Sequence, residues 1–290
     1  MYNSVIVDAL NLSYRSWWNV RELRSSNGDH TGLEFGFIKN LLAWKRIYTK
    51  STIALAWDGA PVRGKTLYAE YKAGRDKSSQ DGEAPWRPRL ETLKEVFAPV
   101  TPSYYNPELE ADEIIAAYVK QQERLGNRTL ILSTDADMQQ LVSDLTQVSP
   151  FKEEIVTGRP GVEQEWGVPP EKLPLLRAMS GDKSDNLPGV PRISTEFKVK
   201  LANESNSIDD LIERIKVANY LSSAQRTKLI EGTNIIRRNH SIMTLQDLTE
   251  PPQLVQEPTG DNTKVIELCR RLELRSLLER REWELFKQAT

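Results

Sequence analysis

Short apolar runs alternate with segments of helical spacing over the first 165 residues of the chain. The runs are mostly β-branched or aliphatic, which is typical of parallel strands that are buried on both faces. They lie at 4–7, 53–57 and 129–133. Between and after them, apolar side chains recur at helical spacing over 33–48 and 111–125. This order predicts an α/β fold in which helices cover a mostly parallel central sheet.

The pattern changes at two places along the chain. Residues 60–90 carry seven basic side chains with two tyrosines and a tryptophan between them, so we expect a long excursion from the sheet there. From about residue 166 the strand pattern ends and helical segments follow, the last of them predicted as one helix over 263–287. We therefore predict a sheet domain over 1–165 and a helical domain over 166–290.

Composition excludes several classes of protein. Charged residues make up 28% of the 290 residues, and no apolar stretch approaches the roughly 20 residues of a membrane helix. Cys269 is the only cysteine and the chain has two histidines, so a disulfide framework, a cysteine-based zinc site and a Ser-His-Asp triad are all disfavoured. The chain enters a strand at once without a basic leader, and we expect a monomer in a reducing cytoplasm.

Acidic residues follow the predicted strands. Asp8, Asp58 and Asp135 each stand directly after, or within two residues of, an apolar run. Because ligands bind outside the carboxyl ends of parallel strands, we expect these three side chains to meet at one edge of the sheet. Further acids form tight groups along the chain: Glu110, Asp112 and Glu113; Asp135 and Asp137; Asp182 and Asp185. Such an oxygen-only set suits Mg²⁺ or Mn²⁺, and two such ions roughly 3.5–4 Å apart can hydrolyse a phosphodiester.

Taken singly, some of these acids could have a purely structural role. Asp135 could cap a short helix, Asp112 could favour a helix dipole and Asp185 could stabilise a turn. Caps give no reason, however, for three predicted strands to end in aspartate. Receiver domains also place aspartates around one magnesium ion, but they are about half this length and have no use for the basic excursion. The net charge of −2 does not exclude nucleic acid, because setting aside nine of the 41 acidic residues leaves 32 against 39 basic ones.

The motifs that carry these residues resemble the 5′ nuclease, or flap endonuclease, superfamily, which includes bacteriophage 5′–3′ exonucleases and the 5′-nuclease domain of DNA polymerase I. After Asp8 they occur in the family's order: Trp57-Asp58-Gly59, Tyr71-Lys72-Ala73-Gly74-Arg75, Glu110-Ala111-Asp112-Glu113, Ser133 to Leu141 and Gly181 to Pro191. The resemblance implies a PIN-like fold with a helical arch over about 60–100 and a C-terminal helix-3-turn-helix motif over about 170–205.

The resemblance further implies a two-metal nuclease that cuts DNA near the junction of a 5′ single strand with duplex. Its substrates would carry a 5′ flap, overhang or nick, and RNA–DNA hybrids would be an additional class. The first ion would be surrounded by Asp8, Asp58, Glu110, Asp112 and Glu113, and the second by Asp135, Asp137, Asp182 and Asp185. Lys72 and Arg75 would engage the scissile phosphate, and Tyr71 would stack on a terminal base. DNA contacts, and a K⁺ ion at the helical hairpin, would involve Gly189, Val190, Arg192, Ser194 and Lys198.

The chain departs from the family pattern at two motifs. Glu113 stands where the family usually has aspartate, and Arg192 and Ser194 replace glycines of the usual Gly-Val-Pro-Gly-Ile-Gly hairpin. Glycines there allow positive φ or a close backbone approach to a phosphate, so the changes at Arg192 and Ser194 affect how the hairpin would bind duplex DNA. Two other functions remain open, a non-catalytic binder of branched DNA and a PIN-like ribonuclease. The retained carboxylates argue against the first, and the arch and hairpin argue against the second.

Overall fold

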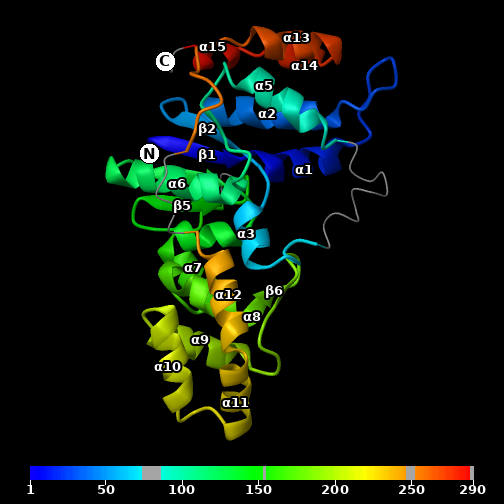
Figure 1. The fold of residues 1–290 in the computed structure, drawn as a ribbon. Coiled ribbons are helices and arrows are strands. Elements are labelled where there is room, and N and C mark those ends of the chain that lie inside the picture. The colour runs from blue at the N-terminus through cyan, green and yellow to red at the C-terminus, as the bar shows by residue number, and fades with distance from the viewer. Residues whose placement is uncertain (74–85, 153–154, 246–251, 288–290) are drawn as a thin grey trace.

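The computed structural model describes residues 1–73, 86–152, 155–245 and 252–287 (Figure 1). A five-stranded sheet lies at the centre of the first half of the chain, in the order β3-β2-β1-β4-β5. Every neighbouring pair of strands is parallel, which confirms the predicted fold class. The strands are β1 (Ser4–Asp8), β2 (Thr52–Trp57), β3 (Ser103–Tyr105), β4 (Thr129–Leu132) and β5 (Thr146–Ser149).

Helices cover both faces of this sheet, and successive residues of a strand point to opposite faces. Val5 and Val7 pack into one apolar cluster with α2, whereas Ile6 between them packs with α6. In Figure 1, β1 and β2 accordingly lie between α2 and α6. Burial on both faces explains why the strands read as continuous apolar runs. The helices of this domain are α1 (Ala9–Val20), α2 (Gly32–Ile47), α3 (Val62–Leu67), α5 (Arg89–Phe97), α6 (Ala111–Arg124) and the 3-10 helix η1 (Ala136–Leu141).

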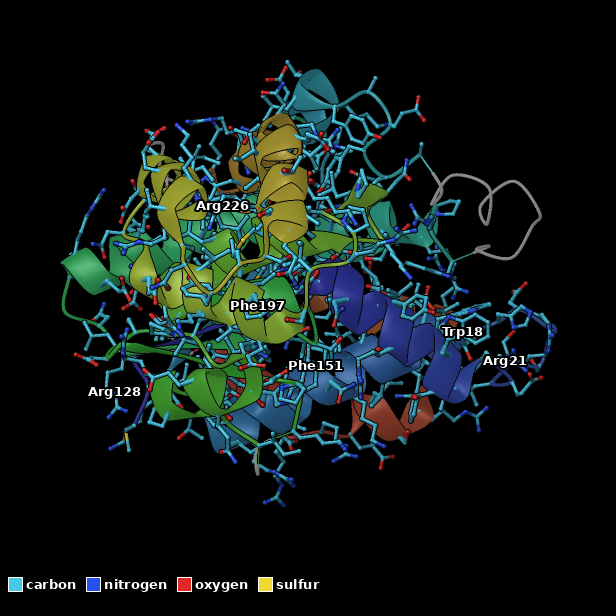
Figure 2. All side chains as sticks on the ribbon, turned by 90° about the horizontal axis from the view of Figure 1, so that it is seen from below. Trp18, Arg21, Arg128, Phe151, Phe197 and Arg226 are labelled. Carbon is cyan, nitrogen blue, oxygen red and sulfur yellow. The ribbon has the colours of Figure 1, made fainter. Side chains whose placement is uncertain are left out.

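The helical domain has an apolar core of its own. Asn239 is buried there, and its amide donates to the carbonyl oxygens of Ala178 and Pro188 at 3.1 and 2.9 Å, which joins α12 to α8 and to a short hairpin. Figure 2 shows Phe197, whose ring stacks on that of Tyr220 with the two ring centroids 6.0 Å apart. The elements are α7 (Arg159–Trp166), η2 (Pro170–Lys172), α8 (Leu173–Ser180), β6 (Gly181–Asp182), β7 (Leu187–Pro188), α9 (Thr195–Glu204), α10 (Ile208–Val217), α11 (Ser223–Glu231) and α12 (Thr233–Met243).

The prediction of one helix over 263–287 was wrong. Three short helices stand there: α13 (Thr263–Arg271), α14 (Arg275–Leu278) and α15 (Trp283–Phe286). The break follows from Glu273, which adopts a left-handed φ of 57° and holds Ser26 with its carboxylate. On the sheet domain, α13 packs against α5, and α14 and α15 pack against α2. None of the helices in the described ranges has the length and apolar character needed to cross a membrane.

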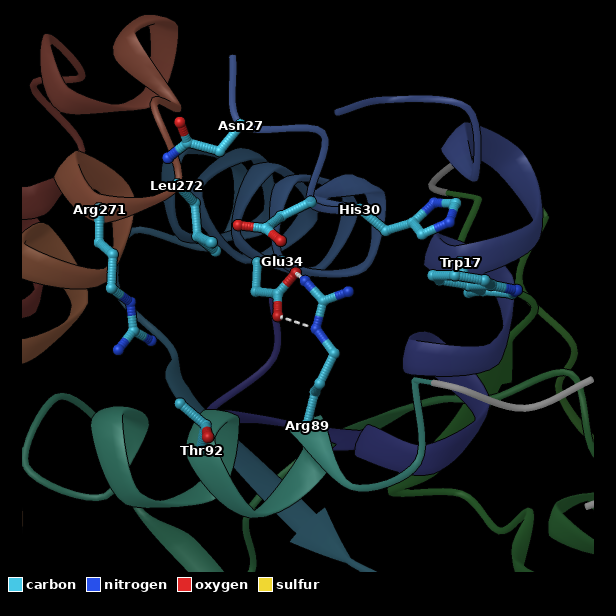
Figure 3. Close-up of a pocket in the computed structure, with 9 residues that line it drawn as sticks. Trp17, Asn27, His30, Glu34, Arg89, Thr92, Arg271 and Leu272 are labelled. Carbon is cyan, nitrogen blue, oxygen red and sulfur yellow. Dashed lines mark hydrogen bonds and ion pairs between the residues drawn. The ribbon is translucent and has the colours of Figure 1, made fainter. Parts of the chain in front are cut away.

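A partly buried ion pair lies where α2, α5 and α13 meet, at a cavity of about 420 Å³ (Figure 3). Glu34 of α2 accepts two hydrogen bonds from the Arg89 guanidinium of α5, with Nε to Oε1 at 2.7 Å. Burial raises the pKa of Glu34, and Arg89 opposes that rise. Arg271 of α13 lines the same cavity, so side chains of the C-terminal helices and of the sheet domain face one space.

Candidate metal centre

The structure brings the three strand-ending aspartates to one cavity, as the topology predicts. Asp8, Asp58 and Asp135 line a cavity of about 490 Å³ at the carboxyl edge of the sheet, together with Glu110 and Asp112 from the start of α6. Asp8 is buried, whereas Asp58 and Asp135 are exposed at the cavity mouth. Five carboxylates from four segments of the chain therefore face one space.

Local hydrogen bonds hold these carboxylates in place. Asp8 accepts from the Asn11 backbone nitrogen at 2.9 Å and from the Ser133 hydroxyl at 3.0 Å. Asp135 accepts from the backbone nitrogen of Asp137 at 2.9 Å, so the capping role considered from the sequence is also real. Asp58 accepts from the Ala111 backbone nitrogen at 3.0 Å, which links the end of β2 to the first turn of α6. Capping thus orients the acids without excluding a second role for them.

Charge accumulates at this edge. Burial, together with the nearby carboxylates of Asp135 and Asp58, raises the pKa of Asp8 from 3.8 to about 7. Burial and the neighbouring Glu110 likewise raise the pKa of Asp112 well above its usual value. An oxygen-coordinating divalent cation would favour the ionised form of every one of these groups, so the residues fit such an ion.

Glu113 differs from the other two acids of α6. Its carboxylate lies within 4.8 Å of those of Glu110 and Asp112, so the three could hold an ion by distance alone. Both of its oxygens are engaged by the protein, however. Oε1 accepts from Arg63 Nε at 2.7 Å, and Oε2 accepts from the Glu110 backbone nitrogen at 3.0 Å. The Arg63 guanidinium also donates to carbonyl oxygens at the end of α12, namely those of Ser241, Ile242 and Thr244.

A second acidic group lies on the side of the helical domain. Asp137 of η1 and Asp182 of β6 both pair with Arg177 of α8. Asp185 is buried nearby and lies 3.9 Å from the ammonium of Lys72. Burial raises the pKa of Asp137 to about 7 although Arg177 lowers it. Asp182 is also desolvated by burial, but hydrogen bonds from Ser184 and the charge of Arg177 outweigh that effect and hold its pKa below the usual value.

Lys72 and Tyr71 connect the two acidic groups. The Lys72 ammonium hydrogen-bonds Glu110, and its backbone nitrogen donates to the Asp185 carbonyl oxygen at 3.0 Å. Burial lowers the pKa of Lys72, but Glu110, Asp112 and Asp185 raise it by more, so the side chain is cationic at neutral pH. The Tyr71 hydroxyl is 3.3 Å from both Glu110 and Asp185, and its ring is buried against Gly64. Arg75 lies outside the described residues.

The hairpin residues occupy one turn between β7 and α9. A side chain at Gly189 would lie 2.0 Å from the Ser180 carbonyl oxygen, so only glycine fits that position. Arg192 is exposed and has a φ of 61°, the conformation that glycine adopts at no cost. Ser194 caps α9, Val190 is buried, and Lys198 is half-buried with a pKa lowered by that burial.

Sequence reasoning missed two features of the site. Arg177 was not singled out, because an arginine in a helix ordinarily signals a solvated face. The aromatic wall of the cavity was also missed. Tyr14 packs edge-on against both Trp18 and Trp86, and all three line the cavity that holds the acids. Trp17 is buried, but Trp18 is 45% exposed and lies at the end of α1 beside Arg21 (Figure 2).

The chain belongs to the 5′–3′ exonuclease family. Residues 3–167 match the model of the family's N-terminal, resolvase-like domain, and residues 168–258 match that of its C-terminal SAM fold. The 5′–3′ exonuclease of Aquifex aeolicus is 25% identical over 289 residues, which cover 98% of this chain and 96% of that protein. The DNA polymerase I of Chloroflexus aurantiacus is 33% identical over 83% of this chain, and the match spans 26% of that polymerase's length.

Solved structures share the fold. The bacteriophage T5 5′-exonuclease with bound divalent zinc superposes with a TM-score of 0.73 at 18% identity, covering 99% of this chain and all of that one (100%). A complex of the T5 flap endonuclease with DNA and metal ions has a TM-score of 0.70 at 19% identity, over 99% of this chain and 97% of that one. The catalytic core of Rad2 bound to DNA substrate gives 0.57 at 12% identity, over 99% and 90% of the two chains. The resemblance to the 5′ nuclease superfamily is confirmed.

Proposed function

We propose that this chain is a structure-selective 5′ nuclease that hydrolyses phosphodiester bonds of DNA near the junction of a 5′ single strand with duplex, leaving 5′-phosphates. The cavity at the sheet edge carries the proposal: five carboxylates and the Lys72 ammonium line one space. Family membership supports the reaction class. RNA in RNA–DNA hybrids would be a further substrate, because phosphate contacts and the metal chemistry do not require a deoxyribose.

The proposed cofactor is a pair of Mg²⁺ ions, for which Mn²⁺ would substitute. Asp8, Asp58, Glu110 and Asp112 would hold the first ion, and Asp135, which lines the same cavity, would lie within reach of both ions. Asp137, Asp182 and Asp185 would serve the second. Such ions activate a water and stabilise charge on the transferred phosphoryl group. Because Glu113 does not line this cavity and pairs with the Arg63 guanidinium, we assign Glu113 to the support of Glu110 and Arg63 instead of to the ion.

Lys72 is the proposed electrostatic catalyst. Its ammonium lies at the cavity between Glu110 and Asp185, where it would stabilise charge developing on the scissile phosphate. Arg75 would act beside it, as the family motif implies. The Tyr71 ring is buried under Lys72 and Gly64, which leaves no face for a base. The exposed aromatic wall of Tyr14 and Trp18 offers such a face, so we propose that an unpaired base stacks there.

Duplex DNA would contact the hairpin of the helical domain. Gly189 and Val190 would offer backbone groups, and the exposed Arg192 and Ser194 would offer side chains to a phosphate. Lys198 would lie one turn further along α9, and a K⁺ ion at this hairpin is part of the proposal. Affinity that rests on phosphate contacts should fall steeply as salt is raised. We propose that one chain acts as a monomer on one junction.

The test is a 5′-flap duplex labelled at its 5′ end and incubated with the protein in Mg²⁺, in Mn²⁺ and in EDTA. A short 5′-labelled product in the metal lanes, and none in EDTA, would support the proposal. Asp135→Asn should abolish this product while flap binding persists, because the exposed carboxylate is not needed for the core. Binding without cleavage in both metals would leave only a binder of branched DNA.

A further inference from the structure

Arg177 occupies the centre of the second acidic group. A single guanidinium nitrogen, Nη2, lies 2.8 Å from Asp137 Oδ1 and 2.6 Å from Asp182 Oδ2. The side chain is 11% exposed, and its guanidinium carbon lies 5.9 Å from the Trp166 ring. The Trp166 indole is itself fixed by a hydrogen bond of 2.8 Å to Gln139. The guanidinium therefore lies between the two acids beside a fixed indole.

The two acidic groups differ in how their charge is balanced. In the first group Asp8 and Asp135 accept hydrogen bonds from uncharged donors, and the Lys72 ammonium pairs with Glu110. Asp137 and Asp182 of the second group instead face a permanent cation, since an arginine does not lose its proton at any physiological pH. Asp182 is further occupied through Oδ1, which accepts from the Ser184 hydroxyl and backbone nitrogen at 2.6 and 2.7 Å.

A divalent ion and this guanidinium compete for the same oxygens. Mg²⁺ holds carboxylate oxygens at about 2.0–2.1 Å, closer than the distances at which Nη2 now stands. An ion cannot share Asp137 Oδ1 and Asp182 Oδ2 with Arg177, because two cations would then lie within a few ångströms in a partly buried site. Ion binding at these oxygens therefore requires the guanidinium to leave them.

We propose that Arg177 is a resident counter-ion of the second acidic group, and that the second divalent ion binds only by displacing it from Asp137 and Asp182. This inference rests on the proposed two-metal function. Its consequence is ordered occupancy: the first site fills at low metal concentration, and the second requires a higher one. Arg177 also keeps the helical domain joined to η1 while the second site is empty.

Mn²⁺ titration of the full chain without DNA tests the proposal, with free ion followed by electron paramagnetic resonance. Wild type should show one tight and one weak site. Arg177→Gln should tighten the weak site by about tenfold or more, a gain of about 1.4 kcal/mol, and leave the tight site unchanged. Arg159→Gln is the matched control, because it removes an exposed pair with Glu171 and should change neither constant. An unchanged weak site in Arg177→Gln would overturn the inference.

A second measurement uses the wild-type chain and does not depend on how the variant folds. The Nε–H resonance of Arg177, observed during Mg²⁺ titration, should shift with the second equivalent of ion and not with the first. A shift that is complete at the first equivalent, or no shift while a second ion binds, would refute displacement. A wild-type chain that binds no divalent ion would overturn both the proposed function and this inference. Binding of two ions without any shift of the Arg177 resonance would overturn the inference alone.

Discussion

Glu113 is the acid for which geometry and family pattern give different roles, and its substitution separates them. The perturbation is Glu113→Gln, compared with Asp112→Asn one position earlier. Glu113 is 3% exposed, and its two oxygens accept from Arg63 Nε and from the Glu110 backbone nitrogen. Glutamine keeps the size and one acceptor oxygen but removes the charge and converts the other oxygen into a donor.

The expected cost follows from those two hydrogen bonds. A hydrogen bond to a charged group contributes about 1.5–3 kcal/mol, and a capping interaction typically about 1 kcal/mol. Arg63 retains its three carbonyl acceptors at the end of α12, so the guanidinium still has hydrogen-bond partners. We therefore expect Glu113→Gln to lower the free energy of unfolding by about 2–4 kcal/mol and to leave Mg²⁺ affinity within a factor of about three.

Asp112→Asn should behave in the opposite way. Burial and the Glu110 carboxylate raise the pKa of Asp112, so its ionised form costs folding energy, and asparagine should not destabilise the metal-free chain. Loss of a ligand should weaken Mg²⁺ binding by at least tenfold, roughly 1.4 kcal/mol. The assays are chemical unfolding in EDTA and calorimetric Mg²⁺ titration. If Glu113→Gln weakened metal binding as Asp112→Asn does, with unchanged stability, Glu113 would be a ligand and our assignment would be refuted.

Four other substitutions probe single contacts of the site and the core. Lys72→Ala should slow flap cleavage by about 10²–10³-fold with little change in flap binding, and an unchanged single-turnover rate would remove Lys72 from the site. Arg192→Gly should raise the free energy of unfolding by about 1 kcal/mol, because the left-handed φ of 61° costs glycine nothing; a loss of stability would contradict this. Glu34→Gln should cost about 1.5–3 kcal/mol, because glutamine keeps one acceptor for Arg89 and loses one charged hydrogen bond, with the exposed Glu171→Gln as the control of small effect in thermal unfolding. Asp8→Asn should stabilise the metal-free chain progressively from about pH 4 to about 7, by up to about 4 kcal/mol, because the folded pKa of Asp8 is raised to about 7; a pH-independent difference in denaturant titrations would refute that shift.

The interior of the fold could be predicted from the sequence, and its edges could not. β1, β2 and β4 are buried on both faces, so each reads as a continuous apolar run. β3 and β5 lie at the two edges of the sheet and read Ser-Tyr-Tyr and Thr-Gln-Val-Ser, without such a run. The β6–β7 pair has two residues in each strand and is fixed by the tight approach of Gly189 to Ser180, which no periodicity reveals.

The acids of the site could be predicted, because sheet topology alone brings strand ends to one edge. The cations that balance them could not. Arg63 and Glu113 are 50 positions apart in the sequence. Arg177 contacts Asp137 only because α8 packs against η1, which depends on how the helical domain docks. The burial of Tyr71 could not be predicted for a similar reason: its ring packs against Gly64, a contact made only once α3 and the following turn are folded.

Charged side chains that connect the sheet domain with the helical domain converge on the carboxyl edge of the sheet. Lys72 reaches Asp185, Asp137 reaches Arg177, and Arg63 joins Glu113 to the end of α12. Each of these contacts includes a charge that a divalent ion or a DNA phosphate would perturb. Apolar packing between the domains, such as Tyr71 with Leu187 and Met243, is insensitive to such charges. The position of the helical domain is therefore energetically linked to occupancy of the acidic groups, and metal binding should change hydrogen exchange at α8 and α12 before it changes exchange at β1.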